Sequence, residues 1–105
     1  MYHAHVYFEL SQESLATHLH HEITANRDDI LRIFPLVMHK VGPHDKPMFE
    51  IHFNDNQQGF VNWLDQHRKG LSVLIHPNTG NDLQDHTDNA VWLGEELPVR
   101  VDIFK

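Results

Sequence analysis

Histidine is the residue type that stands out in this chain of 105 residues, which contains eleven histidines spread over its length. They are His3, His5, His18, His20, His21, His39, His44, His52, His67, His76 and His86. A neutral imidazole is a common metal ligand, and its pKa near neutrality also makes it an acid–base group. If some of these side chains converge in the fold, the chemistry that they favour is metal binding.

His3 and His5 form a pair with the spacing of a β-strand. Residues 2–8 alternate between polar and apolar side chains, which predicts a half-buried strand. Side chains two positions apart on a strand point to the same side, with their Cα atoms about 6 to 7 Å apart, which suits a single metal ion. The alternatives are a polar, solvated sheet face and an interface in which histidines of two subunits hydrogen-bond to each other.

The elements that must position the histidines follow from hydrophobic periodicity. Alternation predicts strands at residues 2–8, 48–53, 71–76 and 97–103, and apolar, β-branched content predicts another at 33–41, which Pro35 places at an edge of the sheet. Helical spacing predicts a first helix that begins near Ser11, and a second helix that is capped by Asp55 or Asn56 and ends at Gly70. Residues 77–88 are expected to form a loop, and residues 91–93 a short helical turn.

This order predicts a single α+β domain over residues 1–105 with a ferredoxin-like βαββαβ fold. The antiparallel sheet would carry both helices on one face and an extra C-terminal strand. In this fold the first strand lies between the third and fourth strands and runs antiparallel to both. His3, His5, His52 and His76 are therefore expected at one end of the helix-free face.

Composition excludes several classes of protein. The chain has no cysteine, which excludes disulfides and iron–sulfur clusters. Its net charge of −7, with eight scattered basic residues, argues against a nucleic-acid partner. No apolar run reaches the roughly 18 residues that span a bilayer, so we expect no membrane partner. Because the N-terminus lacks a signal-peptide pattern, we expect a cytoplasmic protein.

Eight short segments resemble, in order and spacing, segments of the DOPA 4,5-dioxygenase family. They cover residues 2–8, 42–44, 48–51, 63–64, 68–71, 76–80, 85–87 and 92–94. The resemblance implies a ferredoxin-like dimer that cleaves catechols beside their hydroxyl groups with O2. The family's histidines then correspond to His3, His5, His44, His76 and His86.

The resemblance leads us to expect an extradiol dioxygenase that acts on a DOPA-like catechol with O2 at an Fe(II) ion. Zinc or nickel could replace iron in the isolated protein. His5 and His76 are expected to be metal ligands, with His3 and His86 as further ligands. His44 is expected to act in catalysis, by proton transfer or substrate binding. It can reach the site only if its loop folds over or if a partner subunit supplies it.

Two other functions and some details of the site stay open. The chain could be a non-catalytic domain that holds zinc or nickel, or a dimeric module that binds a small aromatic ligand without metal. Glu50 lies on the correct face to complete a site of two histidines and one carboxylate, but an all-histidine site is equally open. We expect a homodimer, because the helix-free face carries Tyr7, Leu74 and several histidines that an isolated domain would leave open.

Overall fold

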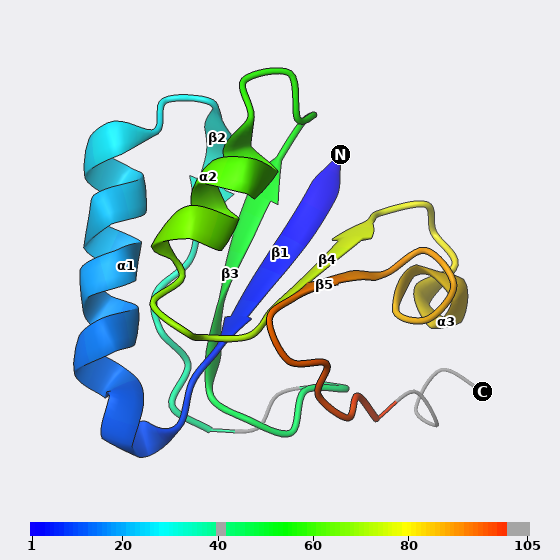
Figure 1. The fold of residues 1–105 in the computed structure, drawn as a ribbon. Helices are drawn as coiled ribbons and strands as arrows, with labels where there is room; N and C mark the ends of the chain where they lie inside the picture. Colours follow the sequence, from blue (N-terminus) through cyan, green and yellow to red (C-terminus); the bar gives the residue numbers. More distant parts are fainter. Residues whose placement is uncertain (40–41, 101–105) are drawn as a thin grey trace.

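The computed structural model describes residues 1–39 and 42–100. Its elements are β1 (Tyr2–Tyr7), the 3-10 helix η1 (Leu10–Gln12), α1 (Glu13–Asn26), β2 (Ile30–Ile33), β3 (Met48–Phe53), α2 (Phe60–His67), β4 (Val73–Pro77), α3 (Asp82–Asp85) and β5 (Val91–Leu93). The strands form one antiparallel sheet in the order β2-β3-β1-β4-β5 (Figure 1). This confirms the predicted ferredoxin-like α+β fold, with β1 between β3 and β4.

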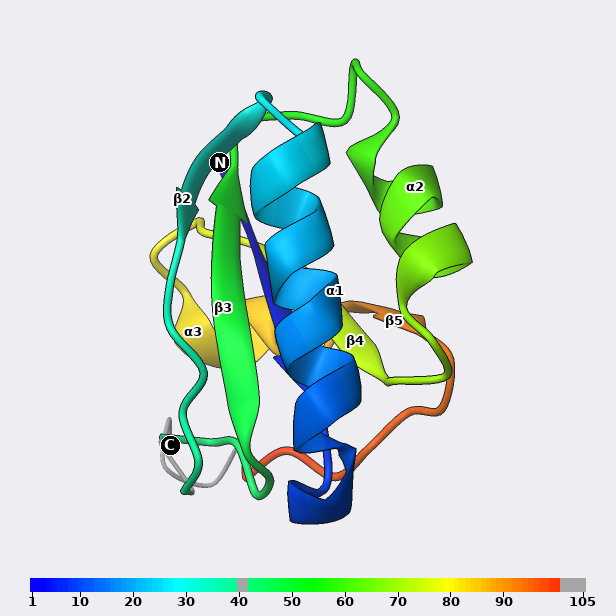
Figure 2. The same ribbon diagram turned by 90° about the vertical axis from the view of Figure 1, so that its left-hand side faces the viewer.

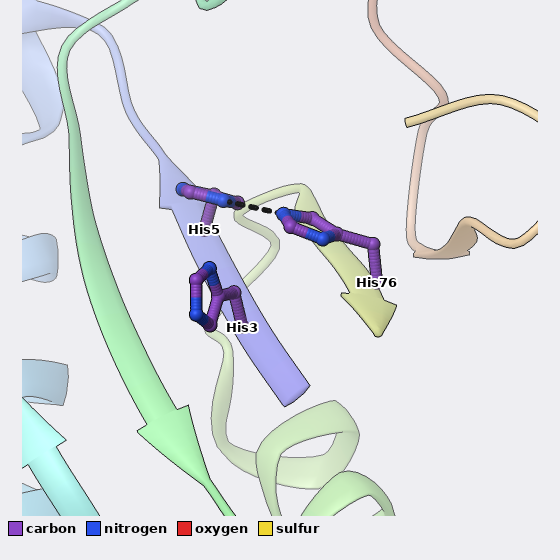
Figure 3. A group of neighbouring side chains, drawn as sticks. All are labelled: His3, His5 and His76. Carbon is purple, nitrogen blue, oxygen red and sulfur yellow. Dashed lines mark hydrogen bonds between the residues drawn. The ribbon is translucent and has the colours of Figure 1, made fainter. Parts of the chain in front are cut away.

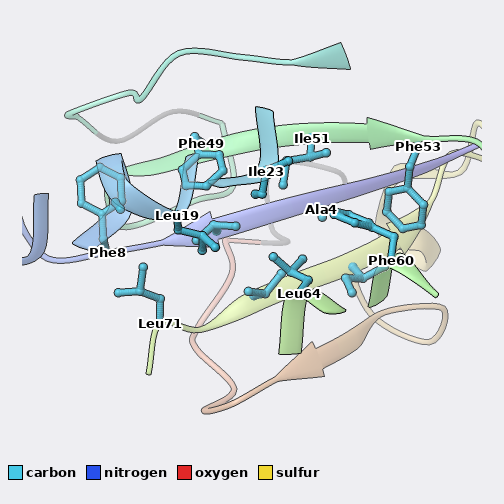
Figure 4. Close-up of a cluster of buried hydrophobic side chains, with 14 residues drawn as sticks. Ala4, Phe8, Leu19, Ile23, Phe49, Ile51, Phe53, Phe60, Leu64 and Leu71 are labelled. Atoms are coloured by element: carbon cyan, nitrogen blue, oxygen red, sulfur yellow. The ribbon is translucent and has the colours of Figure 1, made fainter. Parts of the chain in front are cut away.

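The main hydrophobic core lies between the sheet and the helices α1 and α2, which both cover the same face (Figure 2). Alternation places Ala4 and Val6 of β1 on this face, where both are fully buried. Leu19 of α1 and Leu64 of α2 pack into the same cluster (Figure 4). Removing a buried leucine side chain of this kind costs about 2 to 5 kcal/mol, so this face holds the scaffold in place.

The opposite face of the sheet is partly covered by the chain's own C-terminal segment. A second, smaller cluster forms there from Tyr7, Met48 and Leu74, against which Ala90, Trp92, Leu97 and Val99 pack. Leu74 is completely buried by this arrangement. The expectation that an isolated domain would leave Tyr7 and Leu74 exposed to solvent is therefore wrong. Exposure of these two side chains is no longer an argument for a homodimer.

The second strand differs from its prediction. It covers Ile30–Ile33 instead of residues 33–41, and it pairs with β3 at the edge of the sheet. Pro35 has no N–H to give to a ladder, so the regular pairing ends before it. Val37 forms only an isolated bridge with Met48, and residues 40–41 lie outside the described residues.

The extra C-terminal strand is present, but other residues form it. Residues 91–93 were expected to be a helical turn and instead form β5, which pairs with β4. Valine and tryptophan favour strands, and the open edge of β4 offers unpaired backbone groups. Of the strand expected at 97–103, Val99 makes an isolated bridge with His44, while residues 101–103 lie outside the described residues.

The helix starts also differ in detail. Ser11 lies within η1 instead of capping α1, and Gly59 instead of Asp55 or Asn56 is the residue before α2. Asn56 still acts as a cap, because its Oδ1 accepts a hydrogen bond from the backbone N–H of Val61 at 2.9 Å. Among the helices of the described residues, none combines the length and the apolar character needed to cross a bilayer.

Candidate metal centre

Three histidines of two neighbouring strands meet on the helix-free face of the sheet. His3 and His5 project from β1, and His76 of β4 pairs directly with His3. Nε2 of His5 lies 3.0 Å from Nε2 of His76, and all three rings point toward one another (Figure 3). One ring nitrogen of each residue lies within 4.8 Å of the others. The predicted convergence of these three residues is confirmed.

The 3.0 Å separation of the two Nε2 atoms is compatible with a shared metal ion. Two nitrogens that each bind an ion at about 2.1 Å and at right angles to each other lie about 3.0 Å apart. In the absence of an ion, one of the two nitrogens must donate a hydrogen to the other. The same geometry therefore serves a hydrogen bond or a pair of ligands.

The tautomer of His76 favours the role of ligand. Its Nδ1 lies 2.8 Å from the backbone oxygen of Pro77, and because a carbonyl can only accept, Nδ1 must donate. In the neutral ring this leaves Nε2 with a free lone pair directed at His5. A backbone carbonyl that fixes the outer nitrogen is the usual support of a histidine ligand.

His86 enters the site from the loop that follows β4. Its ring centroid is 4.2 Å from that of His76. Its Nδ1 donates to the backbone oxygen of Asp82 at 2.8 Å, so Nε2 again carries the lone pair. The loop thus folds back over the strand end, as expected.

A buried carboxylate, which we did not identify from the sequence, holds this loop in place. Asp85 is 1% exposed and accepts hydrogen bonds from the backbone N–H of Thr79 at 2.9 Å and from its hydroxyl at 2.6 Å. Burial acts to raise the pKa of Asp85, but the hydrogen bonds from Thr79 and Asn89, together with the nearby His76, outweigh it and hold that pKa below its usual value. The anion ties residue 79 to the segment that carries His86.

His44 also reaches the centre, from the loop before β3 of the same chain. It is buried, and its ring centroid is 4.2 Å from that of His5. Ring nitrogens of His5, His44 and His86 form a second group whose atoms lie within 4.8 Å of one another. Nδ1 of His44 is 2.6 Å from the hydroxyl of Tyr7, a partner that we did not identify from the sequence. Tyr7 lies two positions after His5 on the same strand, so its side chain points to the same side of the sheet. This spacing was the feature of the sequence that could have identified it.

Glu50 and His52 of β3 lie beside the centre. One carboxylate oxygen of Glu50 is 3.5 Å from Nδ1 of His5, and the other is 2.5 Å from Nε2 of His52. The ring of His52 stacks on that of His3 with centroids 3.9 Å apart. His3, Glu50 and His52 could also hold an ion together, so both arrangements left open by the sequence have the necessary atoms nearby.

Burial favours the neutral form of four imidazoles of the centre, those of His3, His5, His44 and His76. It lowers the pKa of His3 and of His44 to about 4, and it lowers that of His5 well below its usual value. Burial also lowers the pKa of His76, although the hydrogen bond to Pro77 opposes this shift. Since a metal binds the neutral ring, these shifts favour the ligand form at neutral pH. Burial raises the pKa of the Tyr7 hydroxyl, which therefore stays protonated.

The residues of the centre fit a bound metal. Nε2 of His3 and Nδ1 of His5 are buried and have no hydrogen-bond partner among the described residues. Buried polar atoms normally have partners, and an ion would satisfy the first of these two. A set of imidazole nitrogens suits iron, zinc, nickel or copper better than calcium or magnesium.

The other histidines do not join the centre. His18, His21 and His39 are exposed, as expected for surface residues. His20 and His67 are half-buried instead, and each bonds to a backbone oxygen, of Phe34 at 2.9 Å and of Trp63 at 2.7 Å. These contacts account for both residues without a functional role.

A cavity of about 630 Å³ opens beside the centre. Its lining includes His86 together with Trp92, Leu97 and Val99 of the C-terminal segment. The volume lies in the usual range of small-molecule sites, and the lining combines an aromatic ring, aliphatic side chains and an imidazole with the acidic residues Asp88 and Glu96.

The fold and this site together define a ferredoxin-like domain with a candidate metal centre built from histidines. The chain belongs to the Dopa 4,5-dioxygenase family, whose model matches residues 2–103. It is similar to a DOPA 4,5-dioxygenase from Amanita muscaria, with 27% identity over 108 residues that cover 95% of this chain and 47% of that protein.

Two further similarities extend the comparison. An uncharacterized 21.2 kDa protein from Botryotinia fuckeliana is 39% identical over 84 residues, which cover 71% of this chain and 46% of that protein. The chain thus spans about half the length of these curated relatives. A crystal structure of a provisionally assigned dioxygenase from Nostoc punctiforme matches with a TM-score of 0.87 and 30% identity, over 96% of this chain and 87% of that one.

Proposed function

We propose that this chain is an extradiol dioxygenase that cleaves a DOPA-like catechol with O2 at an Fe(II) ion held by histidines. Membership of the Dopa 4,5-dioxygenase family supports a dioxygenase. The substrate, the position of cleavage and the metal are our inference. The chain's similarity to the Amanita muscaria enzyme, at 27% identity, makes a catechol the first substrate class to test.

One observation carries the proposal, which is the contact between Nε2 of His5 and Nε2 of His76 at 3.0 Å. It brings together residues from β1 and β4 in the geometry of two ligands on one ion. His3 and His86 lie next to this pair and are proposed as further ligands. Glu50 would then support His5 without binding the ion itself, since its carboxylate faces Nδ1 of that residue.

The residues of the chain have separate tasks in this proposal. Bound Fe(II) would supply the redox chemistry with O2 and coordination positions for a catecholate. The cavity lined by Trp92 and Val99 would hold the aromatic ring beside His86. His44 would bind a substrate oxygen or move a proton at it, because its ring lies against His5.

The reaction is balanced by the catechol and O2 alone. The bond that breaks joins a ring carbon that bears a hydroxyl to the adjacent ring carbon that bears none. Both atoms of O2 enter the product. The ring opens to a carboxylic acid and an aldehyde. Neither a separate reductant nor a second cofactor is needed.

The direct test is reconstitution with Fe(II) without oxygen, followed by addition of catechols and O2. We expect oxygen uptake and a yellow ring-opened product. Bound iron without oxygen uptake would favour the non-catalytic metal domain, and protein that binds aromatic ligands but no metal would favour the small-ligand module. The homodimer stays a prediction that sedimentation tests, and a species of 12.3 kDa at micromolar concentration would contradict it.

A further inference from the structure

We propose that Tyr7 fixes His44 in the tautomer that carries its hydrogen on Nε2, which makes His44 a hydrogen-bond donor to substrate and not a metal ligand. The tautomer is inferred from hydrogen-bond geometry alone. The role toward substrate rests on the dioxygenase function proposed above.

Tyr7 lies at the point where the sheet, the histidine centre and the cavity meet. It ends β1, and its side chain lies on the same face as His5. Its hydroxyl is 2.6 Å from Nδ1 of His44, and the two residues are only 3% and 4% exposed. Its ring stacks on Trp92, with centroids 5.8 Å apart, and Trp92 lines the cavity.

The direction of the hydrogen bond follows from the single hydrogen of the phenol. If Nδ1 of His44 were the donor, the hydroxyl hydrogen of Tyr7 would need another acceptor. Among the residues that the structure describes, Nδ1 of His44 is the partner that this hydroxyl has. A buried O–H without an acceptor is costly, so Tyr7 donates and Nδ1 of His44 accepts.

His44 therefore has the opposite tautomer to His76 and His86. In a neutral imidazole whose Nδ1 accepts, the hydrogen is on Nε2. His76 and His86 donate from Nδ1 to the backbone oxygens of Pro77 and Asp82, so in their neutral rings the hydrogen is on Nδ1 and not on Nε2.

Nearness alone would group His44 with His5 and His86 as ligands. In the metal-free protein His5 also carries its hydrogen on Nε2, which it donates to Nε2 of His76, but the carboxylate of Glu50 faces Nδ1 of His5 and favours a hydrogen there when Nε2 binds an ion. Nδ1 of His44 faces the donor Tyr7 instead, so its hydrogen stays on Nε2.

The consequence is a division between metal ligands and a substrate donor. A ring nitrogen that carries hydrogen has no in-plane lone pair to give to an ion. It can donate a hydrogen bond to an oxygen that gains negative charge, such as an oxygen of a catechol or of its ring-opening product. Tyr7 is then a positioning residue, because it acts through His44.

The test is the tautomer of His44 in the metal-free protein, read at pH 7.5 from long-range proton–nitrogen NMR correlations of the 15N-labelled full chain. The peaks of His44 are assigned by their absence in His44→Gln. We expect hydrogen on Nε2 of His44 and on Nδ1 of His76 and His86, so one spectrum holds both tautomers. Hydrogen on Nδ1 of His44 would overturn the proposal.

Tyr7→Phe removes the donor and provides the second measurement. Without the hydroxyl, the nitrogen shifts of His44 should move toward the average of two tautomers, while those of His76 stay in place. A pattern for His44 unchanged from wild type would show that Tyr7 does not set the tautomer. If the amide spectrum shows that Tyr7→Phe is unfolded, the wild-type tautomer still decides the first claim.

Metal binding gives a third measurement that does not depend on turnover. We expect His44→Gln to bind Co(II) within about threefold of the wild-type affinity, whereas loss of a ligand or its support costs about 10- to 100-fold or more. A loss of that size in His44→Gln would make His44 a ligand and overturn the proposal. None of these measurements requires catalysis. They can therefore still be interpreted if the chain proves not to be a dioxygenase.

Discussion

Nε2 of His5 and Nε2 of His76 lie 3.0 Å apart, although 71 positions separate the two residues in the chain. The antiparallel pairing of β1 with β4 brings them together, because His76 pairs with His3 and is thus the diagonal neighbour of His5. The backbone oxygen of Pro77 accepts a hydrogen bond from Nδ1 of His76, so Nε2 of that ring, which carries no hydrogen, faces His5. The sheet and one short hydrogen bond are therefore enough to bring two ring nitrogens within reach of one ion.

His76→Ala is expected to lose the metal and with it the activity, since it removes one member of this pair. The measurement is iron per chain by mass spectrometry after anaerobic reconstitution and desalting. His21→Ala, at an exposed position on α1, is the matched control and should keep its iron. Full iron content in His76→Ala would exclude His76 as a ligand.

His44→Ala is expected to keep its iron and to lose turnover by about 10²-fold or more, the scale of acid–base catalysis and of a single transition-state hydrogen bond. The loss should appear in kcat, measured by oxygen uptake with a catechol. If His44→Ala loses iron while His76→Ala retains it, the roles of the two residues are reversed.

Glu50→Gln should weaken metal binding without unfolding the protein. Its carboxylate faces Nδ1 of His5 at 3.5 Å, and outer partners of this kind affect metal affinity by about 10- to 100-fold. Competition with a chelator measures this change, and Glu95→Gln, at an exposed position, is the control. A complete loss equal to that of His76→Ala would instead identify Glu50 as a ligand.

Acid should destabilise the metal-free protein. Burial lowers the pKa of His44 from 6.5 to about 4, so between these values the unfolded chain binds more protons than the folded chain. The contribution of His44 is complete above pH 6.5 and is lost as the pH falls toward 4, on the order of 2 kcal/mol. His5 has a shift in the same direction and adds to the loss.

Urea unfolding with a chelator, followed by tryptophan fluorescence at pH 7.5, 5.5 and 4.5, measures this dependence. We expect a smaller free energy of unfolding at each lower pH, and a shallower dependence in His44→Gln. Equal free energies at pH 7.5 and 4.5 in wild type would contradict the burial of neutral imidazoles at the centre.

The sequence was sufficient for the central part of the fold. Strict alternation in β1 and β3 reveals which side chains face the helices, and the order of elements then places β1 between β3 and β4. It was insufficient at the edges. Pro35 shortens the pairing of the second strand, and residues 91–93 form a strand because β4 has a free edge, which is a tertiary effect.

The candidate site could be predicted where strand parity decides it. His3, His5 and His76 follow from alternation and register. The positions of His44 and His86 depend on loops, whose paths no local pattern fixes. The loop of His86 is held by the buried Asp85, and the role of Tyr7 depends on the path of the loop that brings His44 to it.

The central claim is that the histidine centre uses O2 to cleave a catechol ring. The most direct measurement is a reaction of the Fe(II)-loaded protein with DOPA or another catechol under 18O2, with mass spectrometry of the product. We expect one O2 consumed for each ring opened, and both labelled atoms in the product when it is trapped before its aldehyde exchanges with water. Fully iron-loaded protein that consumes no O2 with any catechol, or that yields only unlabelled quinone, would contradict this account.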